Sequence, residues 1–241
     1  MEFQSTTDLQ GSDRGGTRRG APEPKNRLLG AVAQPVLKPG LPYIWVTWLT
    51  KLISGESSCT FSLWFRARYR FEKLLPGADL TRWTSDHEEL VRNRVVNLQV
   101  AHISPKLEVA MTVNGRLATL SGKPDIRYEF DGRAVFEDAK TGLERDSDHV
   151  QVLLYLWLHK LQTKQIGSGR VVYRDRVQEV DIDRLGDVER DATRLLKMCA
   201  NIQTPLPSRS SSGCRSCNIG PSDCSMRFGG PSDSVFQPGR A

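Results

Sequence analysis

Apolar side chains recur along the chain at two periods, and each period predicts a different element. Between Tyr43 and Ile53 the apolar residues are three or four positions apart, which is typical of one face of a helix. A second run with this spacing extends from Phe61 to Pro76. We therefore expect two helices in this part of the chain, separated by Gly55.

A third helix is predicted by the stretch Ser85-Asp86-His87-Glu88, which has the pattern of a capping box. In such a box the Ser85 side chain accepts a bond from the Glu88 amide, and the Glu88 side chain returns one. The helix would run from Ser85 to about Gln99, with His87 in its first turn.

Two dipeptides, Asn114-Gly115 and Asp131-Gly132, separate short segments in which apolar and polar residues alternate. Both dipeptides tolerate the positive φ angles of tight hairpin turns. Because alternation is the period of a strand, the two hairpins predict a small antiparallel meander. Its four strands would span residues 107–113, 116–120, 126–130 and 134–139.

The rest of the chain adds helices on either side of two further strands. We expect an apolar helix at 147–162, strands at 170–173 and 177–182, and a charged amphipathic helix from 183 to about 202. The fold class is therefore α/β, with a small mixed sheet that is mostly an antiparallel meander and is flanked by helices.

The two ends of the chain differ in composition from the middle. Residues 1–40 are rich in Gly, Ser, Thr, Arg and Pro, which predicts a disordered extension, and residues 229–241 predict a flexible tail. One domain at 41–228 fits the total of 241 residues. Past Pro205 the domain has few apolar residues yet holds three of the five cysteines, so something other than hydrophobic burial must order it.

Charge and hydropathy limit the partners and the location. The 34 Lys and Arg exceed the 28 Asp and Glu by a formal charge of +6, which permits contacts with nucleic-acid phosphates but does not demand them. No apolar run reaches the roughly 18 to 20 residues of a membrane-spanning helix, and the chain begins without the apolar stretch of a signal peptide. We expect a cytoplasmic protein with no membrane partner.

Acidic residues and one lysine are spaced to meet in a single site. Asp138 and Lys140 are two positions apart, so they project from the same face of a strand, while Glu137 faces the other way. The turn at Asp131-Gly132 brings Asp125 back beside them. Two carboxylates and a lysine at the ends of paired strands favour phosphodiester hydrolysis with a bound metal ion.

Each of these residues has a candidate role in that chemistry. Asp125 and Asp138 are candidate ligands of Mg²⁺ or Mn²⁺, which prefer carboxylate oxygens, and the carbonyl of Ala139 can add another oxygen. Lys140 would position or help deprotonate the attacking water and offset charge that develops on phosphorus.

Three more residues are expected near this site. Gln151 and Tyr155 are four positions apart on the apolar helix and share a face, from which they can reach the phosphate or the lysine. His87 can supply an imidazole ligand, which would favour Mn²⁺ over Mg²⁺ because imidazole is the softer donor.

The order Gly-x-Pro-Asp, Glu-Asp-Ala-Lys-Thr-Gly and Gln-x-x-x-Tyr, with an upstream histidine, resembles the RecB-type branch of the PD-(D/E)XK nucleases over residues 43–228. The resemblance implies a restriction-endonuclease-like core and a metal-dependent DNA nuclease. Trp83 departs from the pattern, because a glycine is expected four residues before the histidine. By this resemblance the metal-binding and catalytic residues are His87, Asp125, Asp138, Lys140, Gln151 and Tyr155.

The cysteines predict a second metal site. Cys214, Cys217 and Cys224 supply three thiolates, and a zinc ion or an iron-sulfur cluster needs a fourth ligand from elsewhere. One upstream cysteine with a downstream Cys-x2-Cys-x6-Cys is similar to the iron-sulfur nucleases that include the CRISPR-associated Cas-four family and the AddB subunit. This resemblance implies that Cys59 is the fourth ligand of a four-iron four-sulfur cluster, which staples the N- and C-terminal parts together. Zinc is the alternative, and Cys199 is expected to be a buried apolar residue.

The same resemblance implies an exonuclease on single-stranded DNA that processes spacer precursors in CRISPR adaptation beside integrase proteins. Arg66, Arg68 and Arg70, with Trp64 and Tyr69 near them, and then Arg92 and Arg94 are candidates to line a groove for that strand. A recombination or repair nuclease of the same family, including a phage-borne one, and a non-cleaving DNA-binding scaffold are the alternatives.

Overall fold

The computed structural model describes residues 34–74, 81–98, 100–113, 115–208, 213–214 and 217–227. Most of the expected N-terminal extension, residues 1–33, and the expected tail at 229–241 lie outside the described residues. So do Pro76, Gln99 and Asn114, where the sequence predicts the ends of two helices and part of one turn.

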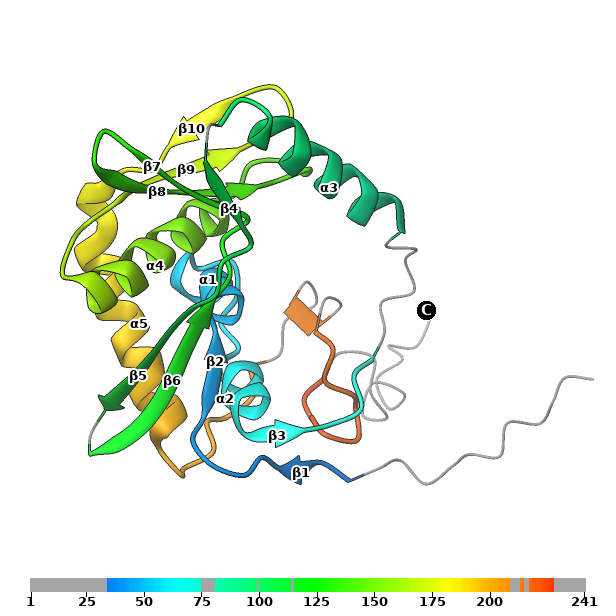
Figure 1. Cartoon of the computed structure of the whole chain (residues 1–241). Coiled ribbons are helices and arrows are strands. Elements are labelled where there is room, and N and C mark those ends of the chain that lie inside the picture. Colours follow the sequence, from blue (N-terminus) through cyan, green and yellow to red (C-terminus); the bar gives the residue numbers. More distant parts are fainter. Residues whose placement is uncertain are drawn as a thin grey trace, which may run out of the picture. The chain divides into compact units, whose positions relative to one another are not determined.

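Five α-helices and ten strands make up the described part of the chain (Figure 1). The helices are α1 (Val46–Ile53), α2 (Thr60–Arg68), α3 (Thr81–Val95), α4 (Asp146–Thr163) and α5 (Leu185–Ala200), with a short 3-10 helix, η1 (Ile182–Arg184). The strands are β1 (Val36–Leu37), β2 (Tyr43–Trp45), β3 (Tyr69–Arg70), β4 (Ala101–Ile103), β5 (Leu107–Val113), β6 (Arg116–Gly122), β7 (Ile126–Phe130), β8 (Arg133–Ala139), β9 (Ser168–Val172) and β10 (Val177–Glu179).

The strands form three sheets. The largest has the order β10-β9-β8-β7-β4, the second has the order β2-β6-β5, and β1 pairs with β3 alone. The β8–β9 and β2–β6 pairs are parallel, and the other pairs are antiparallel. The mixed α/β class that the sequence predicts is confirmed.

The single meander that the sequence predicts is wrong, although both of its hairpins form. The β5–β6 hairpin lies in the three-stranded sheet, and the β7–β8 hairpin lies in the five-stranded sheet, where β7 pairs with β4 instead of β6. Pro124 lies between the two hairpins and has no N–H to donate to a ladder, so it favours a break in pairing at this point. That break leaves Asp125 at the entry to β7.

The bounds of three elements also differ from the predictions. Helix α3 begins at Thr81, four residues before Ser85, so Ser85 is inside the helix and the predicted capping box is wrong. Helix α2 ends at Arg68, because Tyr69–Arg70 pairs with β1. Strand β10 ends at Glu179, and η1 replaces the end of the predicted strand.

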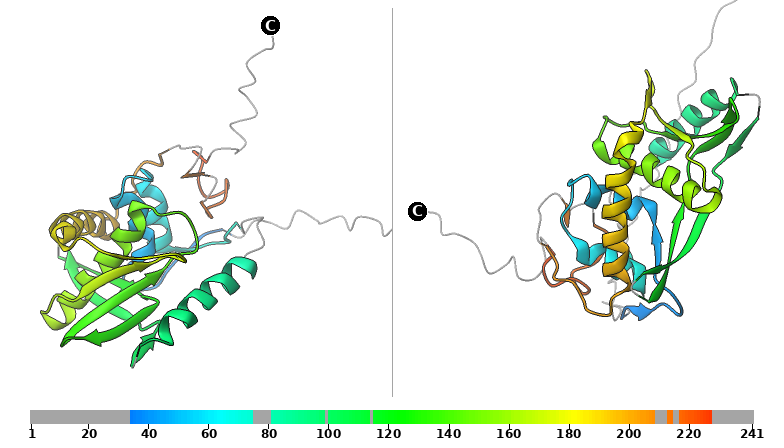
Figure 2. Two further views of the ribbon diagram at one scale, coloured as in Figure 1. Left: turned by 90° about the horizontal axis from the view of Figure 1, so that it is seen from above. Right: turned by 90° about the vertical axis from the view of Figure 1, so that its left-hand side faces the viewer.

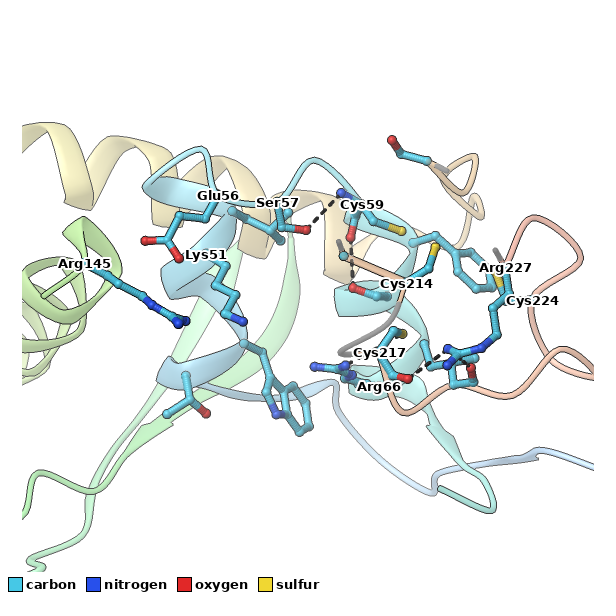
Figure 3. Close-up of a pocket in the computed structure, with 18 residues that line it drawn as sticks. Lys51, Glu56, Ser57, Cys59, Arg66, Arg145, Cys214, Cys217, Cys224 and Arg227 are labelled. Atoms are coloured by element: carbon cyan, nitrogen blue, oxygen red, sulfur yellow. Dashed lines mark hydrogen bonds between the residues drawn. The ribbon is translucent and has the colours of Figure 1, made fainter. Parts of the chain in front are cut away.

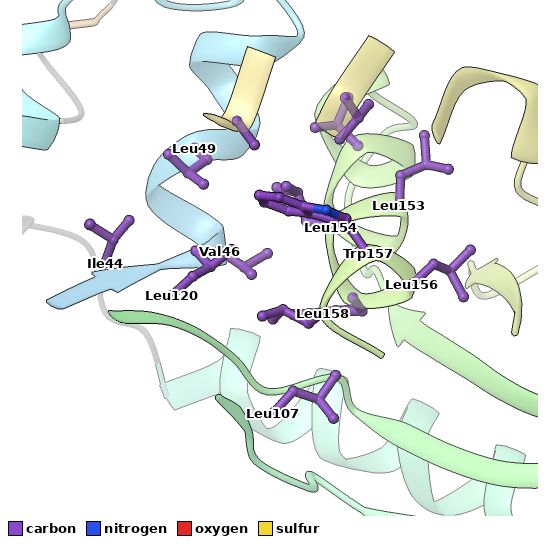
Figure 4. Packing of buried hydrophobic residues seen from close by; sticks show 14 of the residues in the cluster. Ile44, Val46, Leu49, Leu107, Leu120, Leu153, Leu154, Leu156, Trp157 and Leu158 are labelled. Atoms are coloured by element: carbon purple, nitrogen blue, oxygen red, sulfur yellow. The ribbon is translucent and has the colours of Figure 1, made fainter. Parts of the chain in front are cut away.

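Helix α4 is the centre of the hydrophobic core. Its buried side chains face several directions, and the helix contacts α1, α5 and strands of both larger sheets. Figure 4 shows Leu153, Leu154 and Trp157 of α4 packed among side chains from these elements. Gly169 of β9 permits the close approach of strand and helix, because a Cβ there would lie 2.4 Å from Cγ1 of Val152.

The two faces of the β7–β8 hairpin are covered by different helices. Phe136 of β8 packs in the main core with α4, whereas Val135 and Ala139 pack with Val91 of α3 in a smaller cluster. Helix α3 stands apart from α4 and α5 in both views of Figure 2. Because successive strand residues face opposite ways, Asp138 faces α4, and Glu137 faces α3. In the part of the chain that is described, no helix is long and apolar enough to cross a membrane.

Candidate functional site

The two candidate acidic ligands lie at neighbouring strand ends. Strand β7 begins directly after Asp125, and the register Ile126↔Glu137 aligns that end with Asp138 of β8. The Oδ2 atom of Asp125 accepts a hydrogen bond of 2.7 Å from the backbone N–H of Ala139. The hairpin therefore brings Asp125 beside Asp138, as the spacing about Asp131-Gly132 predicts.

One connected network of polar contacts joins the end of β8 to α4. It consists of Asp138, Lys140, Gln151 and Tyr155. The Nζ atom of Lys140 lies 2.6 Å from Oδ2 of Asp138 and donates to Oε1 of Gln151 at 3.0 Å. The Nε2 atom of Gln151 lies 2.8 Å from Oδ1 of Asp138 and 2.7 Å from the Tyr155 hydroxyl. The amide of Gln151 thus holds the acid and the lysine in fixed positions.

The Tyr155 ring lies against β6 because of a glycine there. A Cβ at Gly122 would lie 2.8 Å from Cε1 of Tyr155, which is closer than atoms of this kind approach. The Tyr155 hydroxyl donates to the carbonyl oxygen of Lys123 at 3.2 Å. Gly122 in the Gly-x-Pro-Asp motif therefore makes room for the tyrosine of the third motif.

Burial and charge shift the titration of this network. The Asp138 side chain is almost fully buried, and desolvation raises the pKa of Asp138 to about 6. Desolvation is the largest single effect on the pKa of Lys140 and lowers it, but the charge and hydrogen bond of Asp138, together with the charges of Asp148 and Asp125, outweigh it, and the net shift of that pKa is upward. Lys140 is therefore a cation at neutral pH, which suits it to offset negative charge better than to remove a proton.

His87 reaches the site from α3 and contacts only one of the two acids. Its Nε2 atom lies 3.1 Å from Oδ2 of Asp125, and this hydrogen bond raises the pKa of His87 against the opposing effect of burial. Trp83, which replaces the glycine of the resembled pattern, stacks on the His87 ring with 5.5 Å between ring centroids. Helix α3 covers the face of β8 opposite to Asp138, which explains why the histidine meets Asp125.

Glu137 anchors α3 to the sheet through a buried set of hydrogen bonds. Its side chain is fully buried and accepts two bonds of 2.7 Å from Arg94 and one of 2.8 Å from the Tyr128 hydroxyl. Arg170 donates to the same hydroxyl at 2.7 Å. Arg94, a predicted groove residue, thus binds Glu137 instead, and its position seven residues after His87 places both on one face of the helix.

The donor atoms suit a hard divalent cation, but their present arrangement does not enclose one. Oδ2 of Asp138 is buried, and the Lys140 ammonium 2.6 Å away is its one partner among the described residues, so a lone pair of this oxygen is free for another ligand. Carboxylate oxygens of this kind are preferred ligands of Mg²⁺ and Mn²⁺. Within the described ranges, however, no group of three or more His, Cys, Asp or Glu side chains is arranged to hold a metal ion.

The four cysteines of the predicted second site line one cavity of about 600 Å³ (Figure 3). Desolvation raises the pKa of Cys224, and the neighbouring thiols of Cys59, Cys217 and Cys214 raise it further. They too do not form a metal-holding group among the described residues. Cys199 is fully buried in the main core, as expected.

Two of the residues predicted to line a groove for a single strand, Arg68 and Trp64, have structural contacts instead. Arg68 donates to the carbonyl oxygens of Cys199, Ala200 and Asn201 at the end of α5 and lies over the Trp64 ring. Trp64 is buried, so it offers no exposed face for a base. These residues instead attach α2 to the end of α5.

Comparisons with known proteins bear on this geometry. The sequence matches the PD-(D/E)XK nuclease superfamily over residues 49–222. No curated protein sequence matches the chain. Among solved structures, the crystal structure of SSO0001 superposes with a TM-score of 0.41 and 16% sequence identity, over 77% of this chain and 89% of that one.

Proposed function

The chain belongs to the PD-(D/E)XK nuclease superfamily, whose members are generally metal-dependent enzymes that cleave phosphodiester bonds, and from this premise we propose that it is an exonuclease acting on single-stranded DNA. The observation that carries the proposal is the contact between buried Asp138, Lys140 and Gln151, with Asp125 on the next strand end. An assay with end-labelled single-stranded DNA and Mn²⁺ tests it, and loss of the label as short products is the expected result.

Asp125 and Asp138 are the residues that would hold Mg²⁺ or Mn²⁺ in this proposal. A metal there supplies a polarised phosphoryl oxygen and a water of lowered pKa. Lys140, held by Gln151, offsets negative charge on the phosphate, and Tyr155 fixes the amide of Gln151. His87 would join the metal ligands only after its Nε2 atom turns from Asp125.

Metal affinity should depend on pH through Asp138. Because its pKa is raised to about 6, protons compete for this carboxylate below that pH, and the competition ends above it. We expect the affinity for Mn²⁺ to fall about tenfold for each pH unit below 6 and to be nearly constant above 7. Calorimetric titration with Mn²⁺ at several pH values measures this.

The Asp138→Asn variant is the control for that titration. Asparagine cannot ionise, so its weak affinity for Mn²⁺ should lack the step near pH 6. A step that persists in the variant would assign the titration to another group, such as His87.

We also propose that Cys59, Cys214, Cys217 and Cys224 bind a four-iron four-sulfur cluster, as in the RecB-type iron-sulfur branch. Their common cavity supports this proposal, as does the contribution of the other three cysteines to the raised pKa of Cys224. The C-terminal segment that holds three of them has few apolar contacts beyond Ile219, so a metal group would supply its attachment to α2. Zinc is the alternative with the same ligands.

Anaerobic purification should give a brown protein with about four irons per chain. Cys224→Ala should lose most of the iron and unfold at a lower temperature, because one of four ligands is absent. Cys199→Ala is the matched control, since Cys199 is buried in the core and should leave the iron content unchanged. A colourless protein that contains zinc would show that the four cysteines hold a structural zinc ion and not an iron-sulfur cluster.

The cellular role of such a nuclease is a separate question, for which there are two candidates. Processing of spacer precursors beside the integrase proteins of CRISPR adaptation rests on the resemblance alone, and a recombination or repair nuclease would use the same residues. A non-cleaving scaffold is opposed by the complete set of two acids and a lysine: Asp138 contacts Lys140, and Asp125 is bonded to the backbone N–H of Ala139 between them.

A further inference from the structure

The cavity that contains the cysteines extends beyond them. Its volume of about 600 Å³ is in the range of ligand pockets. Figure 3 shows the cysteines on one side of this space and Lys51 and Arg145 on the other. Glu56 also lies on the side of Lys51 and Arg145 in Figure 3, and the lining further includes Thr47, Trp48 and Leu52 of α1.

Positive charge predominates around this cavity. Lys51, Arg66, Arg145 and Arg227 line it, whereas Glu56 is the one acidic side chain in the described lining. No ion pair joins any of these four cations to an acidic side chain of the described residues. A concave surface with unpaired cations attracts an anionic ligand.

The cysteine group accounts for only two of the four cations. Arg66 lies with Nη2 3.9 Å from Sγ of Cys217, and Arg227 donates to the carbonyl oxygens of Cys217 and Ile219. Among the described residues, the side chains of Lys51 and Arg145 form no ion pair with an acidic side chain, and both residues are exposed; the hydrogen bond of Arg145 to Asp148 comes from its backbone N–H. Their charge is therefore available for a ligand other than the group that the cysteines hold.

An aromatic ring lies beside these two cations. Trp48 is three residues before Lys51 on α1, so both side chains lie on one face of the helix. Trp48 is only partly buried and lines the cavity, and the Lys38 ammonium lies over its ring, 5.5 Å from the ring centroid, as a third cation beside this side chain. An aromatic face next to cations is the combination that binds a single strand of nucleic acid, with a base stacked on the ring and phosphates paired with the cations. A duplex keeps its base faces stacked and cannot offer this contact.

The cavity is also well placed relative to the candidate catalytic residues. Arg145 immediately precedes α4, which carries Gln151 six residues later, a rise of about 9 Å along the helix. A DNA strand bound at Arg145 would thus be held near the candidate catalytic residues Asp138 and Lys140, but not at them.

We propose that Trp48, Lys51 and Arg145 form a subsite that binds single-stranded DNA away from the bond that is cut. This inference rests on the proposed function and adds residues to it. The subsite contacts the strand equally in the ground state and the transition state, so it contributes to KM and not to kcat.

Lys51→Gln and Arg145→Gln test the phosphate contacts. Binding of fluorescent oligothymidine in EDTA, followed by anisotropy, should weaken about threefold to tenfold in each variant, and the slope of log K against log salt should decrease in magnitude by about 0.7 for each lost contact. In the Mn²⁺ cleavage assay KM should rise and kcat should stay the same. Arg190→Gln, an exposed arginine of α5, is the matched control and should change neither quantity.

Trp48→Leu and Trp48→Phe test the stacking contact. Leucine keeps much of the bulk that packs on the core but removes the aromatic face, so binding should weaken about tenfold, whereas phenylalanine should stay within about twofold of the wild type. Thermal unfolding checks that both variants are folded. If Trp48→Leu does not fold, the Lys51→Gln and Arg145→Gln variants still test the subsite.

The outcomes separate this inference from the proposed function. A wild type that binds the strand through these residues but never cleaves it contradicts the proposed function and supports the subsite. A wild type that cleaves, with Lys51→Gln and Arg145→Gln variants that bind like it and keep its salt slope, overturns the subsite. A wild type that does not bind the oligonucleotide overturns it as well.

Discussion

Asp138→Asn is expected to lower the rate of DNA cleavage by at least about a thousandfold. The substitution keeps the size of the side chain and its contact with Gln151 but removes the negative charge that would bind the metal. The loss should appear in kcat and kcat/KM together, because the metal acts on the transition state. Initial rates with Mn²⁺ and with Mg²⁺ on end-labelled single-stranded DNA measure it.

The same variant should be at least as stable as the wild type in the absence of metal. Burial raises the pKa of Asp138 to about 6, so the folded state binds a proton more readily than the unfolded state between about pH 4 and 6. The contribution of Asp138 to the free energy of unfolding is therefore greatest at pH values below the pKa of this group in the unfolded chain. The contribution is lost as the pH rises through 6. At neutral pH the buried negative charge of Asp138 destabilises the folded state, and asparagine carries no such charge. The unfolding temperature of Asp138→Asn should therefore equal or exceed that of the wild type.

A matched control separates lost chemistry from lost structure. Asp187→Asn removes an exposed carboxylate of α5 that pairs only with Arg190, and it should cleave like the wild type. If Asp138→Asn cleaves at the wild-type rate, Asp138 is not the metal ligand. If the wild type and Asp138→Asn are equally inert with every divalent metal, the protein is a scaffold that keeps the fold.

Local periodicity predicts the part of the site that lies on single elements. Strand alternation places Asp138 with Lys140, and the four-residue spacing on α4 places Gln151 with Tyr155, and both pairs are in contact. The hairpin turn at Asp131-Gly132 brings Asp125 to them. The residues in each of these contacts are close together in the sequence, so the local pattern is enough to predict the contact.

Relations between distant elements could not be predicted in this way. Strand β2 has three residues and pairs in parallel with β6 far along the chain, so it has no recognisable period of its own. The position of His87 depends on which face of β8 is covered by α3, and that is decided by packing between elements. The cavity beside Lys51 and Arg145 likewise joins residues that are almost a hundred positions apart.

The second large effect is expected at Glu137, on the face of β8 that α3 covers. Arg94→Met should destabilise the protein by about 3 kcal/mol, because it leaves a fully buried carboxylate without its bidentate partner. Tyr128 and Arg170 remain near Glu137, but the closest Arg170 nitrogen is 3.7 Å from Oε1 and cannot replace two bonds of 2.7 Å. Chemical unfolding of the metal-free protein measures this loss.

Removing both charges should recover most of that stability. In Arg94→Met with Glu137→Gln no charge is left buried, so the double variant should be more stable than Arg94→Met alone, and the two changes should be strongly non-additive. Arg190→Met, at an exposed arginine, is the control and should cost less than about 0.5 kcal/mol. Additive effects of the two substitutions would show that Arg94 and Glu137 do not hold α3 to the sheet.

The same pair has a consequence for His87, because Arg94 fixes its helix two turns away, while Asp86 beside His87 is held by a second, more exposed ion pair with Arg174. Loosening α3 should weaken the bond between His87 and Asp125 and lower the pKa of His87 toward its ordinary value, since that bond is the main cause of the upward shift. Titration of the histidine ring signals by NMR in Arg94→Met and in the double variant measures this. An unchanged His87 pKa in both variants would mean that the packing of Val91 and its neighbours positions the helix without the ion pair.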